Sequence, residues 1–157
     1  AALSISGIRA GLLTETERPL AEGSFKEINI ALAGARVEAA AYFGALFSPA
    51  LDAASLSSTI DRDFTALLYY DRMGAWPVYT VKGTLGGFEA GDVIENFYLG
   101  DPGAFQPWKN GAVSGYLTRY AVGGVPGASF NYGAFGDYVI ISTSFNALKA
   151  ALPLLGL

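Results

Sequence analysis

The chain contains neither cysteine nor histidine among its 157 residues. The missing cysteine excludes disulfide bonds, a thiolate nucleophile and cysteine-ligated zinc or iron–sulfur centres. The missing histidine excludes a Ser-His-Asp triad, an HExxH zinc site and a histidine-ligated haem. Because imidazole is the usual general base near neutral pH, any acid–base chemistry falls to carboxylates, lysine or tyrosine. We therefore expect a binding protein that has no enzymatic activity, no cofactor and no resident metal.

Charged residues are also scarce, at 15% of the chain against about 25% in an ordinary domain. The ten lysines and arginines form no basic run, and the net charge is −4. Phosphate backbones and anionic lipid surfaces attract clustered cations, so we expect neither nucleic acid nor an anionic membrane as the main partner. Hydrophobic residues make up 52% of the chain, which excludes global disorder.

A long apolar run is missing as well. The uncharged stretch 39–51 is short and contains Pro49, and the stretch 120–136 carries five glycines and Pro126. A spanning helix needs about 20 apolar residues, so we expect no membrane span in this segment. The chain opens with Ala1 rather than methionine, which is compatible with a removed leader. We expect export or surface attachment slightly ahead of a cytoplasmic location.

The length predicts one domain, 1–157, whose composition changes along the chain. In residues 1–24, the apolar residues of 3–13 indicate a short strand. The charged residues and the proline that follow them indicate an exposed linker.

Residues 25–60 are predicted to be helical. Ser24 starts a capping box, after which apolar residues recur at helical spacing. The first helix is expected to end near Pro49, and a second short helix to run from about 50 to 60. A strand over 26–32 is the competing interpretation, because apolar residues alternate with polar or small ones there. Both interpretations of this stretch stay open on the sequence.

Residues 63–143 indicate antiparallel strands, because glycine and proline interrupt aromatic and β-branched runs at roughly even intervals. The five runs are 64–73, 76–85, 92–99, 113–122 and 137–143. The stretch 138–141 is apolar at both parities, as in a central strand. Ser144 can cap a C-terminal helix over 144–152, which Pro153 ends.

The order of these elements predicts an α+β fold. In it, N-terminal helices pack on one face of a curved antiparallel sheet of about five strands, and a short C-terminal helix follows the sheet. A small β-barrel with flanking helices is the alternative.

Aromatic residues carry the strongest functional signal: nine tyrosines, ten phenylalanines and two tryptophans, most of them after residue 60. They occur at both parities of the predicted strands, as at Tyr69 and Tyr70, whereas a half-buried sheet needs one apolar face. The second face must then be covered by helices, by another protein or by a ligand. The candidate partner- or ligand-binding residues are Tyr69, Trp76, Tyr79, Phe97, Trp108, Tyr116 and Tyr120.

Acidic residues supply the remaining candidate chemistry. Asp61, Asp63 and Asp71 lie close together in sequence, and paired carboxylates act as acid and base in hydrolases. An Asp-x-Asp pair can also hold a cation. The plainer interpretation is that these carboxylates cap turns and pair with neighbouring arginines at the surface. We assign no catalytic and no metal-binding residue.

Three functions remain, in order of preference. The first is a non-enzymatic binding or assembly domain with a semi-exposed aromatic surface, as part of a surface, envelope or particle structure, with a protein partner or a second copy bound. The second is a carrier of an apolar small molecule, in a cavity lined by residues such as Tyr79, Phe97 and Tyr116. The third is a carboxylate-dependent hydrolase, for which Asp92 and Glu95 are candidate carboxylates besides the three aspartates named above.

Overall fold

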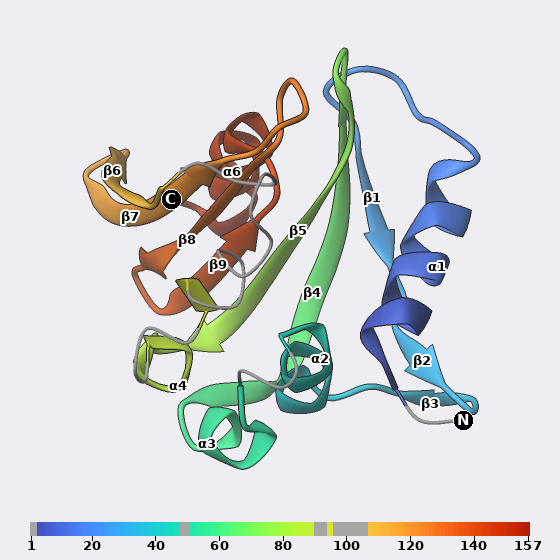
Figure 1. Ribbon diagram of the computed structural model, residues 1–157, viewed down its shortest axis with the longest axis vertical. Coiled ribbons are helices and arrows are strands. Elements are labelled where there is room, and N and C mark those ends of the chain that lie inside the picture. The colour runs from blue at the N-terminus through green and yellow to red at the C-terminus, as the bar shows by residue number, and fades with distance from the viewer. Residues whose placement is uncertain (1–2, 48–50, 90–93, 96–106) are drawn as a thin grey trace.

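A computed structural model describes residues 3–47, 51–89, 94–95 and 107–157 (Figure 1). A seven-stranded sheet forms its centre, in the order β1-β4-β5-β9-β8-β7-β6, with every neighbouring pair antiparallel. The strands are β1 (Phe25–Ile28), β4 (Ile60–Asp71), β5 (Gly74–Gly83), β6 (Lys109–Val113), β7 (Tyr116–Val122), β8 (Ser129–Phe135) and β9 (Tyr138–Ser142). A separate two-stranded sheet joins β2 (Ala31–Leu32) and β3 (Ala35–Arg36). The predicted α+β class is confirmed, and the β-barrel alternative is wrong because the sheet stays open between β1 and β6.

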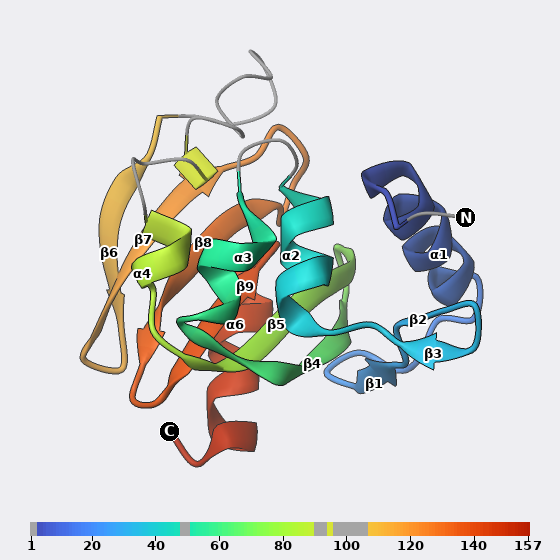
Figure 2. The same ribbon diagram turned by 90° about the horizontal axis from the view of Figure 1, so that it is seen from below.

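Helices lie on both faces of the sheet (Figure 2). The first face carries α1 (Ile5–Thr16), α2 (Ala39–Leu46), α3 (Ala53–Ser57) and α4 (Gly86–Glu89). The second face carries α6 (Phe145–Ala151), which continues into the 3-10 helix η2 (Leu152–Leu155). The N-terminal helices share one face as expected, and the C-terminal helices cover the other, because the central strands are apolar on both sides and each side needs a cover. None of the helices in the described ranges has both the length and the apolar character needed to cross a membrane.

The core under the first face is built around aromatic rings. The ring of Phe43 in α2 has its centroid 5.4 Å from those of Phe64 in β4 and Phe88 in α4. The Tyr42 hydroxyl donates a hydrogen bond to the Tyr79 hydroxyl at 2.8 Å, and both tyrosines are buried. Much of the aromatic excess of the sequence is thus covered by the helices of the chain itself.

The core under the second face is mainly aliphatic. Val78, Phe135 and Ile140 of the sheet are fully buried and belong to one cluster with Leu148 and Leu152 of the C-terminal helices. The central position predicted for 138–141 is confirmed, since β9 is the fourth of seven strands and its residues enter both cores.

Two predictions for the N-terminal third are wrong. The stretch 3–13 belongs mostly to helix α1, which Ser4 caps by accepting a hydrogen bond from the Gly7 amide at 3.2 Å. No helix begins at Ser24: the strand alternative for 26–32 is confirmed by β1 and β2. Pairing of β1 with β4 satisfies the backbone there, and such tertiary pairing overrides local helix signals. The helical part of 25–60 reduces to α2 and α3.

The strand predictions divide into confirmed, corrected and missing ones. The runs 64–73, 76–85 and 137–143 correspond to β4, β5 and β9. The run 113–122 is corrected, because Ser114 and Gly115 have positive φ and form the tight turn between β6 and β7. Strand β8 was not predicted, and the run 92–99 lies outside the described residues apart from Ile94 and Glu95.

The C-terminal helix is confirmed with its predicted cap. The Ser144 hydroxyl accepts a hydrogen bond from the Ala147 amide at 3.4 Å. Leu148 is buried in the second-face core, whereas Phe145 at the start of the helix is 44% exposed. This exposed ring contributes to the surface described next.

Candidate functional site

The predicted aromatic residues are divided between the two faces of the sheet and do not form one surface. Tyr79 is buried in the first-face core, and Trp108 packs against the same core. On the second face, Trp76 is buried and Tyr69 and Tyr116 are half-buried. The remaining two are Tyr120, half-buried on β7, and Phe97, which lies outside the described residues.

Exposed apolar side chains gather at one end of the sheet. They come from the α1–β1 connection, the β4–β5 hairpin, the β7–β8 connection and the start of α6, and all except the last occupy the upper end of Figure 1 as loop tips. We call this set the hairpin end: Leu20, Met73, Val122, Val125 and Phe145, exposed by 44–64%. It holds five of the eight large apolar side chains that are exposed in the described part of the chain.

Backbone hydrogen bonds and close packing bring these segments together. The Gly23 amide donates to the Tyr70 carbonyl at 2.7 Å, which ties the α1–β1 connection to β4. A Cβ placed on Gly127 would lie 2.8 Å from the Cβ of Met73, so the β7–β8 connection lies directly against the hairpin. The Ser129 amide donates to the Thr143 carbonyl at 3.1 Å, just before α6 begins. The hairpin end is therefore held by the sheet rather than by independent loops.

Asp71 organises the tip of the β4–β5 hairpin. Its Oδ1 accepts hydrogen bonds from the amides of Met73 at 2.8 Å and Gly74 at 3.1 Å, and from Nε1 of Trp76 at 2.9 Å. Burial by itself would raise the pKa of Asp71, but the hydrogen bonds from Trp76 and the two amides outweigh it and hold that pKa below its usual value. The ionised carboxylate thus presents Met73 at the tip and fixes the Trp76 ring beneath it.

A groove of about 470 Å³ lies beside the hairpin, between β4 and α6. Tyr69 lines it, and the Tyr69 ring has its centroid 4.9 Å from that of Phe25. The described residues that line the groove are Glu22, Tyr69, Asp71, Arg72, Met73, Asn146, Lys149 and Ala150. Two of them are acidic and two basic, so the groove can accept an apolar side chain together with a charge of either sign.

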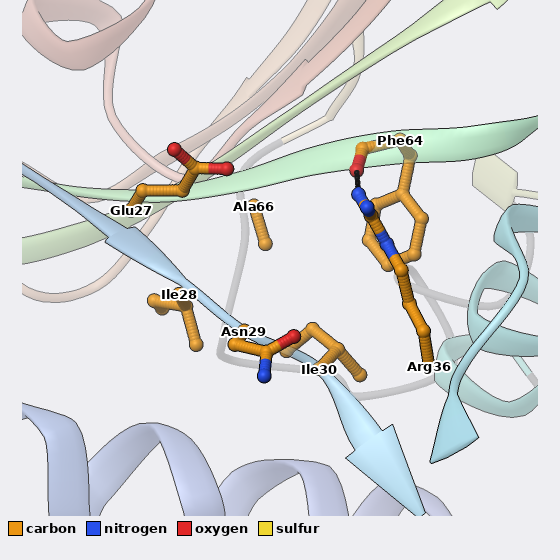
Figure 3. Close-up of a pocket in the computed structure, with 7 residues that line it drawn as sticks. All are labelled: Glu27, Ile28, Asn29, Ile30, Arg36, Phe64 and Ala66. Carbon is orange, nitrogen blue, oxygen red and sulfur yellow. Dashed lines mark hydrogen bonds between the residues drawn. The ribbon is translucent and has the colours of Figure 1, made fainter.

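A second, polar notch of about 340 Å³ lies where β1 leaves the edge of β4 (Figure 3). The Arg36 guanidinium spans it and donates to the Phe64 carbonyl at 3.1 Å, as Figure 3 shows. Arg36 also lies 3.9 Å from the Asp63 carboxylate. Through these contacts, Arg36 links β3 to β4 at the point where β1 no longer pairs with β4. We assign Arg36 a structural role.

The acidic residues do not form the predicted cluster. Asp61 and Asp63 lie near the start of β4 and Asp71 at its end, so eight residues of strand, about 26 Å, separate Asp63 from Asp71. Asp92 lies outside the described residues. Within the described ranges, no three acidic side chains come close enough to hold a metal ion. A hydrolase built on Asp63 together with Asp71 is therefore wrong on geometric grounds.

The two described tyrosines predicted to line the cavity of a carrier, Tyr79 and Tyr116, lie on opposite faces of the sheet. Tyr79 contacts Tyr42 and Phe43 on the first face, whereas Tyr116 contacts Phe135 on the second. The sheet separates the two rings, so Tyr79 and Tyr116 cannot line the same cavity.

Sequence reasoning missed a polar network on the first face. The Arg119 guanidinium donates to Glu95 through Nε at 3.1 Å and through a terminal nitrogen at 2.5 Å, and it donates to Asn110 at 2.8 Å. The Tyr132 hydroxyl donates to the same carboxylate at 2.5 Å. The hydrogen bond from Arg119 lowers the pKa of Glu95 most, and the bond from Tyr132 adds to it against the opposing effect of burial. Glu95 and Arg119 are 24 residues apart, so no local sequence pattern predicts that they pair.

The chain matches no family model, and comparison with curated proteins and with solved structures gives no match either. Its class is defined by its own architecture, an open, mainly antiparallel seven-stranded sheet with helices on both faces. Function must therefore be argued from the surface of this chain alone.

Proposed function

We propose that this protein is a non-enzymatic assembly domain that associates with a second copy of itself through the hairpin end. The observation that carries the proposal is the set of exposed apolar side chains on neighbouring segments at this end, Met73 and Val125 above all. Contiguous exposed apolar patches on soluble domains mark interaction sites, because water disfavours them.

The local charges at the hairpin end suit a second copy as the partner, although the net charge of −4 makes two copies repel each other at long range. The groove beside the hairpin carries Glu22 and Asp71 together with Arg72 and Lys149, so its charges balance. A two-fold interface brings the same patch together from both subunits, and such a patch must be self-complementary. Neutral, mixed-sign surroundings of an apolar centre satisfy this condition.

The test is the solution mass measured by light scattering across a range of concentrations. The wild-type chain is expected to move from its monomer mass of 16.4 kDa towards twice that value as concentration rises. The double variant Met73→Asp, Val125→Asp is expected to raise the concentration of half-association by about tenfold or more, because two carboxylates would be desolvated in the interface.

The matched control is Leu154→Asp, since Leu154 is 59% exposed in η2. The residues after η2 lie at the other end of the sheet, where Leu157 would be 3.6 Å from a Cβ placed on Gly136 in the β8–β9 turn. Its concentration of half-association should equal that of the wild type. A wild-type chain that stays monomeric at every concentration contradicts the proposal, as does an equal effect of both sets of substitutions.

A further inference from the structure

An apolar cleft of about 420 Å³ separates α1 from the chain segment that runs from β1 into β2. It lies on the first face, away from the hairpin end. The described residues that line it are Leu3, Ser4, Ser6, Gly7, Ile8, Gly11, Leu12, Glu15, Ile28, Asn29, Ile30, Ala31, Leu32 and Tyr42. Its volume falls within the range of small-molecule sites, about 300–1,000 Å³.

The walls of the cleft are mainly apolar, and Glu15 is the one charged residue among the described residues that line them. Ile8 and Leu12 of α1 face Ile28, Ile30 and Leu32 on the opposite side, and Figure 3 shows Ile28 on the α1 side of β1. The exposed polar side chains that line it are small and neutral, from two serines and an asparagine. An apolar surface of this kind favours the removal of an apolar molecule from water.

Two ionisable groups border the cleft, and neither offers a free charge. The Glu15 carboxylate lies 2.5 Å from Nζ of Lys26, which neutralises it. Tyr42 is fully buried, and its hydroxyl is bonded to Tyr79. Burial raises the pKa of Tyr42 to about 12, so its hydroxyl stays protonated near neutral pH. An anionic ligand would have to compete with Glu15 for Lys26.

The cleft is long rather than round. The lining residues within α1 extend from Ser6 to Glu15 at helical spacing, a rise of about 14 Å along the helix axis. On the other wall, the lining residues 28–32 follow one another along an extended chain. A narrow, elongated molecule fits between these two walls better than a compact one.

The α1 wall is loosely packed. Of α1, which the structure describes in full, Ile8 is the single buried residue. Gly11 lies in the middle of this helix and lines the cleft, although glycine is a poor helix former. A Cβ placed on Gly11 would meet no atom of the described chain beyond its own helix and neighbours within 4 Å. Because Gly11 is itself exposed, this space is open to solvent, and a larger side chain at this position can extend into the cleft.

We infer that the cleft between α1 and the β1–β2 segment binds one elongated, uncharged apolar molecule, such as an acyl or isoprenoid chain with a neutral head group. The site is independent of the hairpin end and goes beyond the proposed assembly function. Apolar side chains of both walls contact the chain of the ligand, and the neutral hydroxyl and amide groups at the rim face its head.

The test uses the full chain and the uncharged fluorophore N-phenyl-naphthylamine, whose emission rises in an apolar site. The wild-type chain is expected to bind it, and the variant Gly11→Leu to bind it about tenfold or more weakly, because the new side chain fills the cleft. Leucine favours the helix over glycine, so Gly11→Leu should melt no lower than the wild type, as measured by circular dichroism.

The matched control is Ala10→Leu, which adds a similar side chain to an exposed neighbouring position that does not line the cleft. It should bind the probe as the wild type does. Hexadecanol should displace the probe more strongly than hexadecanoate, because the carboxylate would have to compete with Glu15 for Lys26. The inference is overturned if the wild type takes up no probe, if Gly11→Leu binds like Ala10→Leu, or if hexadecanoate is preferred. It is also overturned if Gly11→Leu abolishes self-association, since a second copy would then occupy the cleft.

Discussion

Replacement of Phe43 by alanine is expected to lower the free energy of unfolding by about 3–5 kcal/mol, the largest effect we predict for a single substitution. The Phe43 side chain is fully buried. Its ring contacts those of Tyr42, Phe64, Tyr79 and Phe88 at centroid distances of 5.4–5.8 Å. Alanine removes these contacts and leaves a cavity that α2 and the sheet can close only in part. Domains of this size are stable by about 5–15 kcal/mol, so much of the stability would be lost.

Urea unfolding followed by circular dichroism measures this change. The matched control is Phe145→Ala, because Phe145 is 44% exposed and its ring centroid lies 4.8 Å from Nζ of Lys149. An exposed cation–π contact is worth about 0.5–1 kcal/mol, so the control should lose no more than this. Equal losses in the two variants would show that α2 does not pack on the sheet as described.

Substitution of Arg119 by methionine is expected to lower the free energy of unfolding by about 2 kcal/mol. Methionine keeps much of the side-chain volume but leaves Tyr132 as the remaining hydrogen-bond donor to the Glu95 carboxylate among the described residues. Removing one partner of a fully buried ion pair costs about 3–5 kcal/mol. The Arg119 side chain is 34% exposed and that of Glu95 13%, so solvent reduces the loss.

The same network predicts a dependence on pH. The pKa of Glu95 is lower in the folded chain than the ordinary value of 4.5. Its contribution to stability is therefore complete above pH 4.5 and is lost as the pH falls through the lower, folded-state pKa. The difference in unfolding free energy between the wild type and Glu95→Gln should be largest near neutral pH and shrink in acid.

Denaturant unfolding at several pH values measures both effects, with Glu38→Gln as the control. Glu38 also pairs with an arginine, Arg62, but the two side chains are 52% and 84% exposed. Exposed pairs contribute about 0–1 kcal/mol, so the control should change stability little at any pH. If Glu38→Gln lowers the free energy of unfolding as much as Arg119→Met, then burial does not explain the effect of the Arg119–Glu95 pair.

Local sequence signals were sufficient wherever an element depends on its own residues. Ser144 at the start of an apolar helical pattern predicted α6, and the aromatic and β-branched run 64–73 predicted β4. They failed at β8, where Asn131 and Gly133 interrupt the apolar pattern. In the structure, Asn131 lies opposite Tyr120 of β7 and Ser142 of β9, and a Cβ on Gly133 would lie 2.9 Å from the Leu117 carbonyl oxygen. These residues fit the strand because of neighbours that the sequence pattern does not reveal.

The candidate surface was predictable in kind but not in place. The aromatic excess of the sequence correctly implied two apolar faces, yet it did not indicate that Tyr79 and Trp76 would be covered by the chain itself. The exposed residues of the hairpin end are mostly aliphatic, and Met73 and Val125 belong to turns that carry no binding motif. Their exposure depends on which loops end up side by side.

By itself, the sequence determined the chemistry that this protein lacks, the α+β class and the elements whose caps and periodicity are local. These properties follow from side-chain types and from backbone preferences within a few residues. The tertiary structure decided that Phe25–Ile28 is a strand, that Glu95 meets Arg119 and that five apolar side chains share one exposed end. Each of these depends on contacts between residues far apart in the chain, where pairing and burial outweigh local propensity.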